Sequence, residues 1–406
     1  MAKMKSIPTR DKVKDGDTWN LTKTFKSDAA WEKGYVTLEG MVPGFEKFRG
    51  KLGNSAKVIR DCCDFESEFE MLGEKLGVYA FLKSTEDVAN SEYQGMVGRF
   101  TYLATKAGEM ASFIAPELQA IPKKTMEKYI KSATLKDYQY SLEKLMRYRP
   151  HILSMKEERL LAMQGEVAGS ASKIFGQLND ADMKFGFVTN EHGEKVELTH
   201  GSAGVLMESP KRSVRKKAFT QFYGVYEDHA NTLASTLSSS VLQDVYGARV
   251  RNHHSAREAA LFSDRVPVAV YDSLIEAVHN NLDTLYKYYD IRKRALGLRK
   301  IATWDGRAPL IDEGKVNIPY AKAVDMVCES VAPLGANYGK VLRKGLLEDR
   351  WVDRYENKGK RSGAFSYGAY GTPPYIMMNY KADSLDSMFT LTHEAGHSMH
   401  TWHSNK

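Results

Sequence analysis

Residues 385–406 read LDSMFTLTHEAGHSMHTWHSNK and contain the pattern His-Glu-x-x-His at positions 393–397. On a helix, His393 and His397 project from one face about 6 Å apart along the axis. Both imidazoles can therefore bind one Zn²⁺ ion at about 2.0–2.1 Å. Glu394 lies beside the first histidine, where its carboxylate can hold a zinc-bound water and accept the proton as that water attacks a carbonyl. The segment predicts a helix with two zinc ligands, His393 and His397, and a general base, Glu394.

Two further histidines follow the motif, and neither is interpreted as a zinc ligand. His403 occupies the third-ligand position of the longer pattern His-Glu-x-x-His-x-x-Gly-x-x-His, but His400 stands where that pattern has glycine. A residue with a side chain disfavours the positive φ that turns the chain back, and on a continuous helix His403 lies about 15 Å from His393. His400 is nearer the metal face and is a candidate for substrate contact, with a plain helix position as the equal alternative.

A catalytic zinc ion usually has three protein ligands, and the third is not evident near the motif. His253 and His254 are candidates, but adjacent helical side chains diverge by about 100°, so only one of them could serve. Asp383 and Asp386 lie before the predicted helix or in its first turn. The alternative for the whole motif is a buried helix whose histidines are satisfied by hydrogen bonds.

Most of the remaining sequence has helical periodicity. The clearest example begins at Pro267, which suits a first helical turn because proline lacks an N–H, and it ends near Gly297. Its apolar residues recur every three or four positions and share one helix face: Leu274, Val278, Leu282, Leu285 and Tyr289. The predicted fold class is therefore mainly α.

Two segments break this pattern. Residues 185–199 carry β-branched and aromatic residues on both sides of a turn near Gly193 and predict a β-hairpin. Residues 359–375 read GKRSGAFSYGAYGTPPY, whose glycines and prolines exclude a helix, and residues 376–380 after them could form a strand. Glycines beside aromatic residues indicate either close backbone approach to a ligand or a structural loop.

Composition excludes several classes of protein. The 58 Lys and Arg residues exceed the 51 Asp and Glu residues by 7, and this excess is scattered, so no tract predicts a nucleic-acid surface. Cys62, Cys63 and Cys328 are too few for a disulfide scaffold and lack metal-site spacing, whereas free thiols fit a reducing compartment. No apolar run is long enough to span a membrane, and residues 1–19 lack the apolar core of a secretory signal. We expect a cytoplasmic protein that binds neither nucleic acid nor a membrane.

The chain resembles a known family. Residues 359–379, followed by LTHEAGHSMH at 391–400, resemble oligoendopeptidase F, in the thimet oligopeptidase-like M3 family of zinc metallopeptidases. Residues 258–278 and the hairpin around Gly193 are also similar to that family.

The resemblance implies a mainly helical, two-lobed fold with a deep channel, divided into an N-terminal lobe at 1–180 and a catalytic-lobe portion at 181–406. It implies hydrolysis of short, unstructured peptides with one Zn²⁺ ion held by His393 and His397 and with Glu394 as general base. The glycine-rich segment would flank the cleft, where backbone groups can pair with an extended peptide. The candidate substrate-binding residues are Tyr370, Gly371, Tyr375 and His400.

The resemblance also implies residues that this sequence lacks. Family members continue with a helical stretch that carries a glutamate as third zinc ligand and, later, histidine and tyrosine residues that support the reaction. The sequence resembles about the first two thirds of the family pattern, so we expect the third ligand beyond Lys406, on a further C-terminal segment or a second chain. The alternatives are a non-catalytic peptide-binding or helical scaffold protein with an incomplete metal site, and a helical protein whose C-terminal histidines bind metal incidentally.

Overall fold

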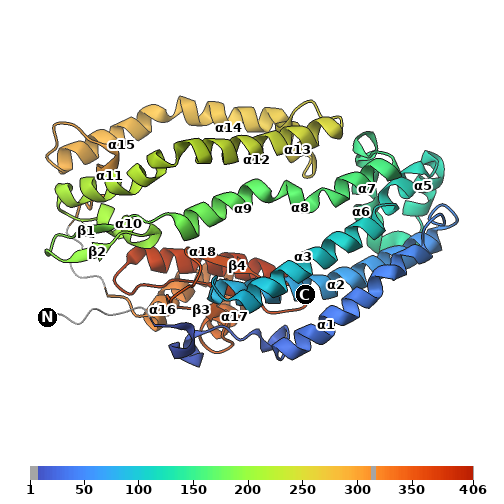
Figure 1. The fold of residues 1–406 in the computed structure, drawn as a ribbon, viewed down its shortest axis with the longest axis horizontal. Coiled ribbons are helices and arrows are strands. Elements are labelled where there is room, and N and C mark those ends of the chain that lie inside the picture. Colours follow the sequence, from blue (N-terminus) through green and yellow to red (C-terminus); the bar gives the residue numbers. More distant parts are fainter. Residues whose placement is uncertain (1–7, 312–316, 406) are drawn as a thin grey trace. The chain divides into compact units, whose positions relative to one another are not determined.

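The computed structural model describes residues 8–311 and 317–405. The fold is mainly helical with two small sheets, as the sequence predicts (Figure 1). The chain divides into two compact units, one made of Met1–Ile114, Ser132–Leu135 and Gly314–Lys406, the other of Ala115–Lys131 and Lys136–Glu313. The first unit thus joins both ends of the chain. The predicted division into lobes at residue 180 stays a prediction.

Among its described residues, the first unit has three N-terminal and three C-terminal α-helices and one sheet. Side-chain caps begin the N-terminal helices, because Ser27, Ser55 and Asn90 each accept a hydrogen bond from a backbone N–H of the first turn. The helices are α1 (Asp28–Met41), α2 (Ala56–Glu86), α3 (Ser91–Ala111), α16 (Tyr320–Ser330), α17 (Ala336–Leu347) and α18 (Leu385–Ser404).

The sheet of the first unit has the order β3-β5-β4. Its strands are β3 (Val352–Asp353), β4 (Phe365–Tyr367) and β5 (Tyr375–Met377). The central strand β5 is parallel to β3 and antiparallel to β4, and all three of its residues are buried. Of the strand expected at residues 376–380, only 376 and 377 are in β5, which begins one residue earlier and ends three residues sooner. The edge strand β4 lies inside the glycine-rich segment, where the sequence predicted only irregular structure.

The core of the first unit packs α18 against the sheet and α16. Leu391, Ala395 and Met399 of α18 are buried in one cluster with Val324 and Ile376. Four-residue spacing places these three α18 residues on one face, so one side of the helix packs into the core.

The second unit contains the remaining helices and the predicted hairpin. The hairpin strands β1 (Phe187–Thr189) and β2 (Lys195–Glu197) are antiparallel, and Gly193 in the turn has φ +82°, a conformation that glycine adopts at little cost. The helices are α4 (Ile114–Ala120), which begins at the boundary of the units, α5 (Lys123–Ile130), α6 (Gln139–Arg147), α7 (Met155–Met163), α8 (Gly165–Ala168), α9 (Ser170–Gly176), α10 (His200–Met207), α11 (Arg212–Asp228), α12 (Ala230–Val250), α13 (Ala256–Phe262), α14 (Val268–Asn280) and α15 (Leu282–Ala295).

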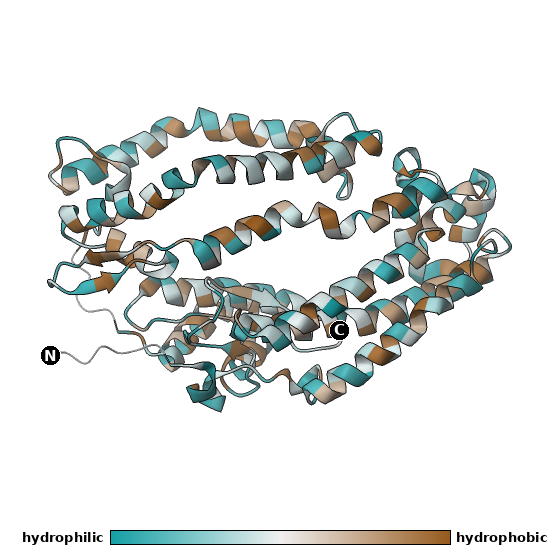
Figure 2. Cartoon of the chain, in the orientation of Figure 1, coloured by the Kyte–Doolittle hydropathy of each residue, from teal (hydrophilic) through white to brown (hydrophobic). Residues whose placement is uncertain are grey.

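The helix predicted from Pro267 to Gly297 is two helices, α14 and α15, joined at Asn281. Pro267 is the N-cap of α14, and Gly297 follows the end of α15 with φ +63°. The apolar face that Leu274 and Val278 share is largely exposed, since Leu274 is 63% and Val278 54% accessible. Figure 2 shows apolar positions along both helices. Among the helices of the described residues, none combines the length and apolarity that a membrane span requires.

Candidate active site

α18 carries the predicted zinc-binding motif on the face opposite its packed side. Leu391, Ala395 and Met399 are buried, whereas His393 and His397 are exposed. Because helical residues advance by about 100° per position, the packing of one face fixes the direction of the other. Packing of the buried face fixes the orientation of α18 and exposes the two histidines to solvent.

The two histidine rings converge at one point. Nε2 of His393 and Nε2 of His397 lie 3.1 Å apart, and the rings are nearly perpendicular, at 80°. Two nitrogens bound to one tetrahedral zinc at about 2.0–2.1 Å are separated by roughly 3.3 Å. The pair therefore fits a shared zinc ion with only a small adjustment, and neutral imidazole is a ligand that zinc favours.

Glu394 lies between these histidines in sequence and is only 8% exposed. Within the described ranges its carboxylate has no hydrogen bond or ion pair to another residue. The residue is largely buried, but its carboxylate oxygens are not fully enclosed, so they stay accessible to a bound water or cation. This arrangement also departs from the alternative of a buried helix with satisfied histidines, because both imidazoles face solvent.

Strand β4 lies beside the motif helix. The hydroxyl oxygens of Ser366 on β4 and Ser398 on α18 are 2.8 Å apart, and Ser398 directly follows His397. Since β4 is at the edge of its sheet, its outer backbone groups are available to pair with an added strand. The site therefore combines a histidine pair with an adjacent peptide-pairing edge.

The glycine-rich loop after β4 is held from two sides. The backbone N–H of Tyr370 donates to Glu74 Oε2 on α2 at 2.8 Å. The side-chain amide of Asn405, after α18, donates to Thr372 O at 3.0 Å. Gly371 has φ +73°, which a residue with a Cβ rarely adopts. The loop is thus anchored, while the side chain of Tyr370 stays exposed.

The four candidate substrate-binding residues differ in accessibility. Tyr370, Gly371 and His400 are exposed. Tyr375 is buried, its hydroxyl contacts Thr24 and donates to Asn20 O, and burial raises the pKa of its phenol to about 12. Its side chain supports the sheet, which leaves the other three as the accessible candidates.

The candidate third ligands are not gathered at the motif. Among the residues that the structure describes, no group of three His, Cys, Asp or Glu side chains is placed to hold a metal ion. α18 continues without a turn through His400 to Ser404, so the longer zinc motif with a returning His403 does not form. His253 stacks on His151, with ring centroids 3.7 Å apart.

Sequence reasoning missed the residues that hold this site together. Buried Lys360 donates to Asp353 Oδ1 at 2.6 Å and to the carbonyl oxygens of Tyr355 and Met378. Arg10 pairs with the same Asp353 and with Glu86. No local pattern signals such contacts, because the partners are separated by up to 343 residues.

Known proteins are similar to this chain in sequence and in fold. Residues 205–406 match the model of peptidase family M3, and residues 117–185 match the model of oligopeptidase F. Oligopeptidase PepF of Bacillus subtilis is 40% identical over 406 residues, which is 100% of this chain and 60% of that protein. The plasmid oligoendopeptidase F of Lactococcus lactis subsp. cremoris is 38% identical over 97% of this chain and 65% of its own length.

A solved structure agrees with these sequence matches. Oligoendopeptidase-F from Enterococcus faecium is 33% identical and superposes with a TM-score of 0.69, covering 79% of this chain and 60% of that one. The chain therefore spans somewhat less than two thirds of the length of the relatives it matches.

Proposed function

Because this chain belongs to peptidase family M3, we propose that it carries the zinc-binding and proton-accepting part of an endopeptidase that cleaves short, unstructured peptides. The observation that carries the proposal is the convergence of the Nε2 atoms of two exposed histidines, 3.1 Å apart, next in sequence to Glu394, whose carboxylate has no partner among the described residues. The names of the relatives, oligopeptidase and oligoendopeptidase, support the substrate class.

Each residue of the motif has one task in this proposal. His393 and His397 would hold the zinc ion, which when bound supplies a Lewis acid for the scissile carbonyl and lowers the pKa of a water molecule to about 7. Glu394 accepts the proton from that water and passes it to the leaving amine, because its carboxylate lies on the same helix turn and has no competing partner. The third ligand lies outside the described residues in this proposal.

The substrate would lie along β4 as an added strand. Main-chain hydrogen bonds to an edge strand bind any extended peptide irrespective of its sequence, whereas a folded protein cannot supply an extended segment. Exposed Tyr370, Gly371 and His400 lie on the loop after β4 and on α18, and they are the proposed contacts beyond the backbone. A cytoplasmic location is part of the proposal, since all three cysteines are free.

Zinc content and peptide hydrolysis test the proposal together. In a protein that includes the third ligand, we expect about one zinc ion per chain by elemental analysis at buffered free zinc, its loss in His397→Ala, and its retention in the control His400→Ala. Hydrolysis of a mixture of short peptides, followed by mass spectrometry, should stop when a chelator removes the metal.

Two outcomes contradict the proposal. Equal zinc content in the wild type and His397→Ala would show that His397 is not a zinc ligand. Hydrolysis that survives chelation would remove zinc from the reaction. Peptide binding without any hydrolysis would instead favour a non-catalytic peptide-binding protein.

A further inference from the structure

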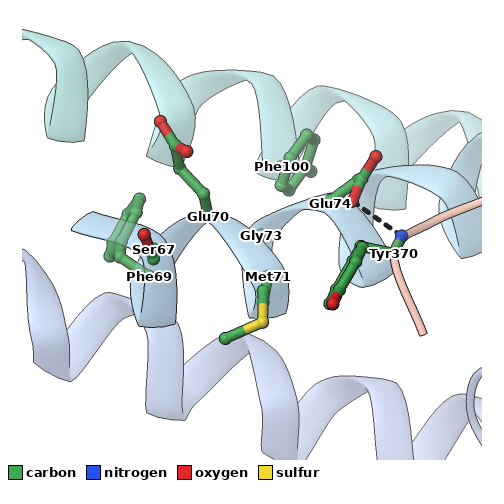
Figure 3. Close-up of a pocket in the computed structure, with 8 residues that line it drawn as sticks. All are labelled: Ser67, Phe69, Glu70, Met71, Gly73, Glu74, Phe100 and Tyr370. Atoms are coloured by element: carbon green, nitrogen blue, oxygen red, sulfur yellow. Dashed lines mark hydrogen bonds between the residues drawn. The ribbon is translucent and has the colours of Figure 1, made fainter. Parts of the chain in front are cut away.

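A cavity of about 720 Å³ lies next to the glycine-rich loop, within the first unit. It is lined by α2, by Phe100 of α3 and by Tyr370 of the loop (Figure 3). The active-site motif does not line it, so none of the roles proposed above explains it. Its volume falls in the range of about 300–1,000 Å³ that is typical of ligand sites.

The wall formed by α3 is rigid and aromatic. A Cβ at Gly77 of α2 would lie 2.6 Å from the Phe100 ring, so only glycine lets the two helices bring this ring so close. Phe69 and Met71 add apolar surface on the α2 side. A cavity with such walls suits the aliphatic part of a long side chain, and ring faces attract a cation at its end.

Two exposed carboxylates also line the cavity. Glu70 and Glu74 are one turn apart, and Figure 3 shows both projecting from the same side of α2. Glu74 is engaged through one oxygen by the backbone of Tyr370, while Glu70 has no ion pair or hydrogen bond to any residue in the described ranges. Like charges at this spacing destabilise a helix, so a bound cation would offset a cost that the free protein carries.

Neither Glu70 nor Glu74 forms an ion pair within the described residues. Burial, and after it the charge of Glu70, raises the pKa of Glu66, one turn earlier, to about 7. The ammonium of Lys75 approaches Gly371 instead, and Lys75 does not line the cavity.

The loop connects this cavity to the reaction site. Ser366 touches Ser398 beside the zinc motif, and Tyr370 follows four residues later. The four residues from Ser366 to Tyr370 span at most about 14 Å. An extended substrate peptide covers the same distance with roughly four of its own residues. A peptide lying along β4 would therefore bring a side chain three to four positions from the scissile bond within reach of the cavity.

We propose that this cavity binds the side chain of a lysine or arginine in the substrate, about three to four residues from the cleaved bond. The inference rests on the proposed function, because it assumes a peptide along β4. It adds a specificity that backbone pairing alone does not provide.

Peptide binding to the zinc-loaded Glu394→Gln chain, in which hydrolysis is blocked, tests the inference by calorimetry. The probes are octapeptides with blocked ends, so that no terminal amine competes, carrying one lysine or one norleucine at each position in turn. At one position, we expect lysine to bind about three- to tenfold more tightly than norleucine. Glu70→Gln should remove most of this preference. Glu68→Gln, an exposed glutamate on the same helix outside the cavity, should leave it unchanged.

The outcomes separate the two proposals. Equal affinity for lysine and norleucine peptides at every position would overturn the cavity assignment and leave the proposed function standing. A loss of preference in Glu68→Gln as large as in Glu70→Gln would overturn it as well. Failure of every peptide to bind would overturn the proposed function, and the role of the cavity with it.

Discussion

Adjacent residues of the motif project about 100° apart, and that difference separates their proposed roles. His393 is exposed on α18, while Glu394, one position later, is 8% exposed at the edge of the packed face. A ligand must reach the metal, whereas a proton acceptor works best in a dry, fixed position. Because a helix rotates by about 100° per residue, neighbouring positions can provide an exposed metal ligand and a more buried proton acceptor.

Glu394→Gln tests the proton-acceptor role at the residue scale. The amide keeps the size of the carboxylate but does not accept a proton, so peptide hydrolysis should fall by about 100- to 10,000-fold. Zinc content should not change, because the amide leaves both histidines in place. Parallel elemental analysis and peptide turnover measure the two effects, and turnover close to that of the wild type would contradict the role.

The stacked pair His151 and His253 predicts a pH-dependent stability. Burial, followed by the proximity of His151, lowers the pKa of His253, and its Nδ1 has no hydrogen-bond partner. The unfolded chain therefore binds a proton more readily than the folded chain, and stability falls as the pH drops below the ordinary histidine value of about 6.5. His253→Phe keeps a stacking ring without this titration.

Urea unfolding at about pH 7.5 and pH 5.5 measures this effect. We expect the wild type to lose more stability on acidification than His253→Phe. The control His279→Phe replaces an exposed histidine of α14 and should behave as the wild type does. Identical losses in all three proteins would show that His253 titrates normally.

At the scale of elements, one glycine decides how the glycine-rich segment meets the end of α2. Gly359 has φ +75°, and a Cβ there would collide with the carboxylate of Asp87. The backbone N–H of Val88 donates to Gly359 O at 2.7 Å, so the close approach is part of the junction. Gly363 has a similar φ, +82°, but nothing lies within 4 Å of its Cβ position.

Gly359→Ala should destabilise the protein more than Gly363→Ala. Both substitutions pay the strain of a positive φ, roughly 1–2 kcal/mol, but only the first adds the overlap with Asp87, about 1–3 kcal/mol more. The difference between their urea midpoints isolates the overlap. Equal destabilisation would mean that Asp87 moves aside at little cost.

At the scale of the whole molecule, a buried ion network joins the N-terminal segment to the β3-β5-β4 sheet. Lys360 and Asp353 have fully buried side chains, and Arg10 reaches the same carboxylate at 2.6 Å. Burial lowers the pKa of Lys360, yet three carbonyl oxygens and one carboxylate surround its ammonium. Such a group is costly to bury and more costly to leave without its partner.

Lys360→Met should therefore destabilise the first unit by about 3–5 kcal/mol. Methionine has similar length but removes the donor that Asp353 and the carbonyl oxygens share, and it leaves the Asp353 carboxylate paired with Arg10 alone. The control Arg343→Met breaks the exposed pair with Asp325, and it should hardly change the urea midpoint because water replaces the lost partner. A small effect of Lys360→Met would show that water satisfies the buried acceptors.

The sequence by itself determined the local features of this protein. The helices, the hairpin around Gly193 and the pairing of His393 with His397 on one face all follow from spacing and turn chemistry, which act over a few residues. The resemblance to its family also rests on local runs, and the family matches confirm it.

Only the tertiary structure decided which surfaces are covered and which side chains meet. It placed the predicted apolar residues Leu274 and Val278 in solvent, Tyr375 inside and Tyr370 outside, and it brought Lys360, Asp353 and Arg10 together. Periodicity states which residues share a face, but the partner that covers a face comes from distant parts of the chain. Burial and long-range ion pairing are therefore properties of the packed molecule, and no local pattern contains them.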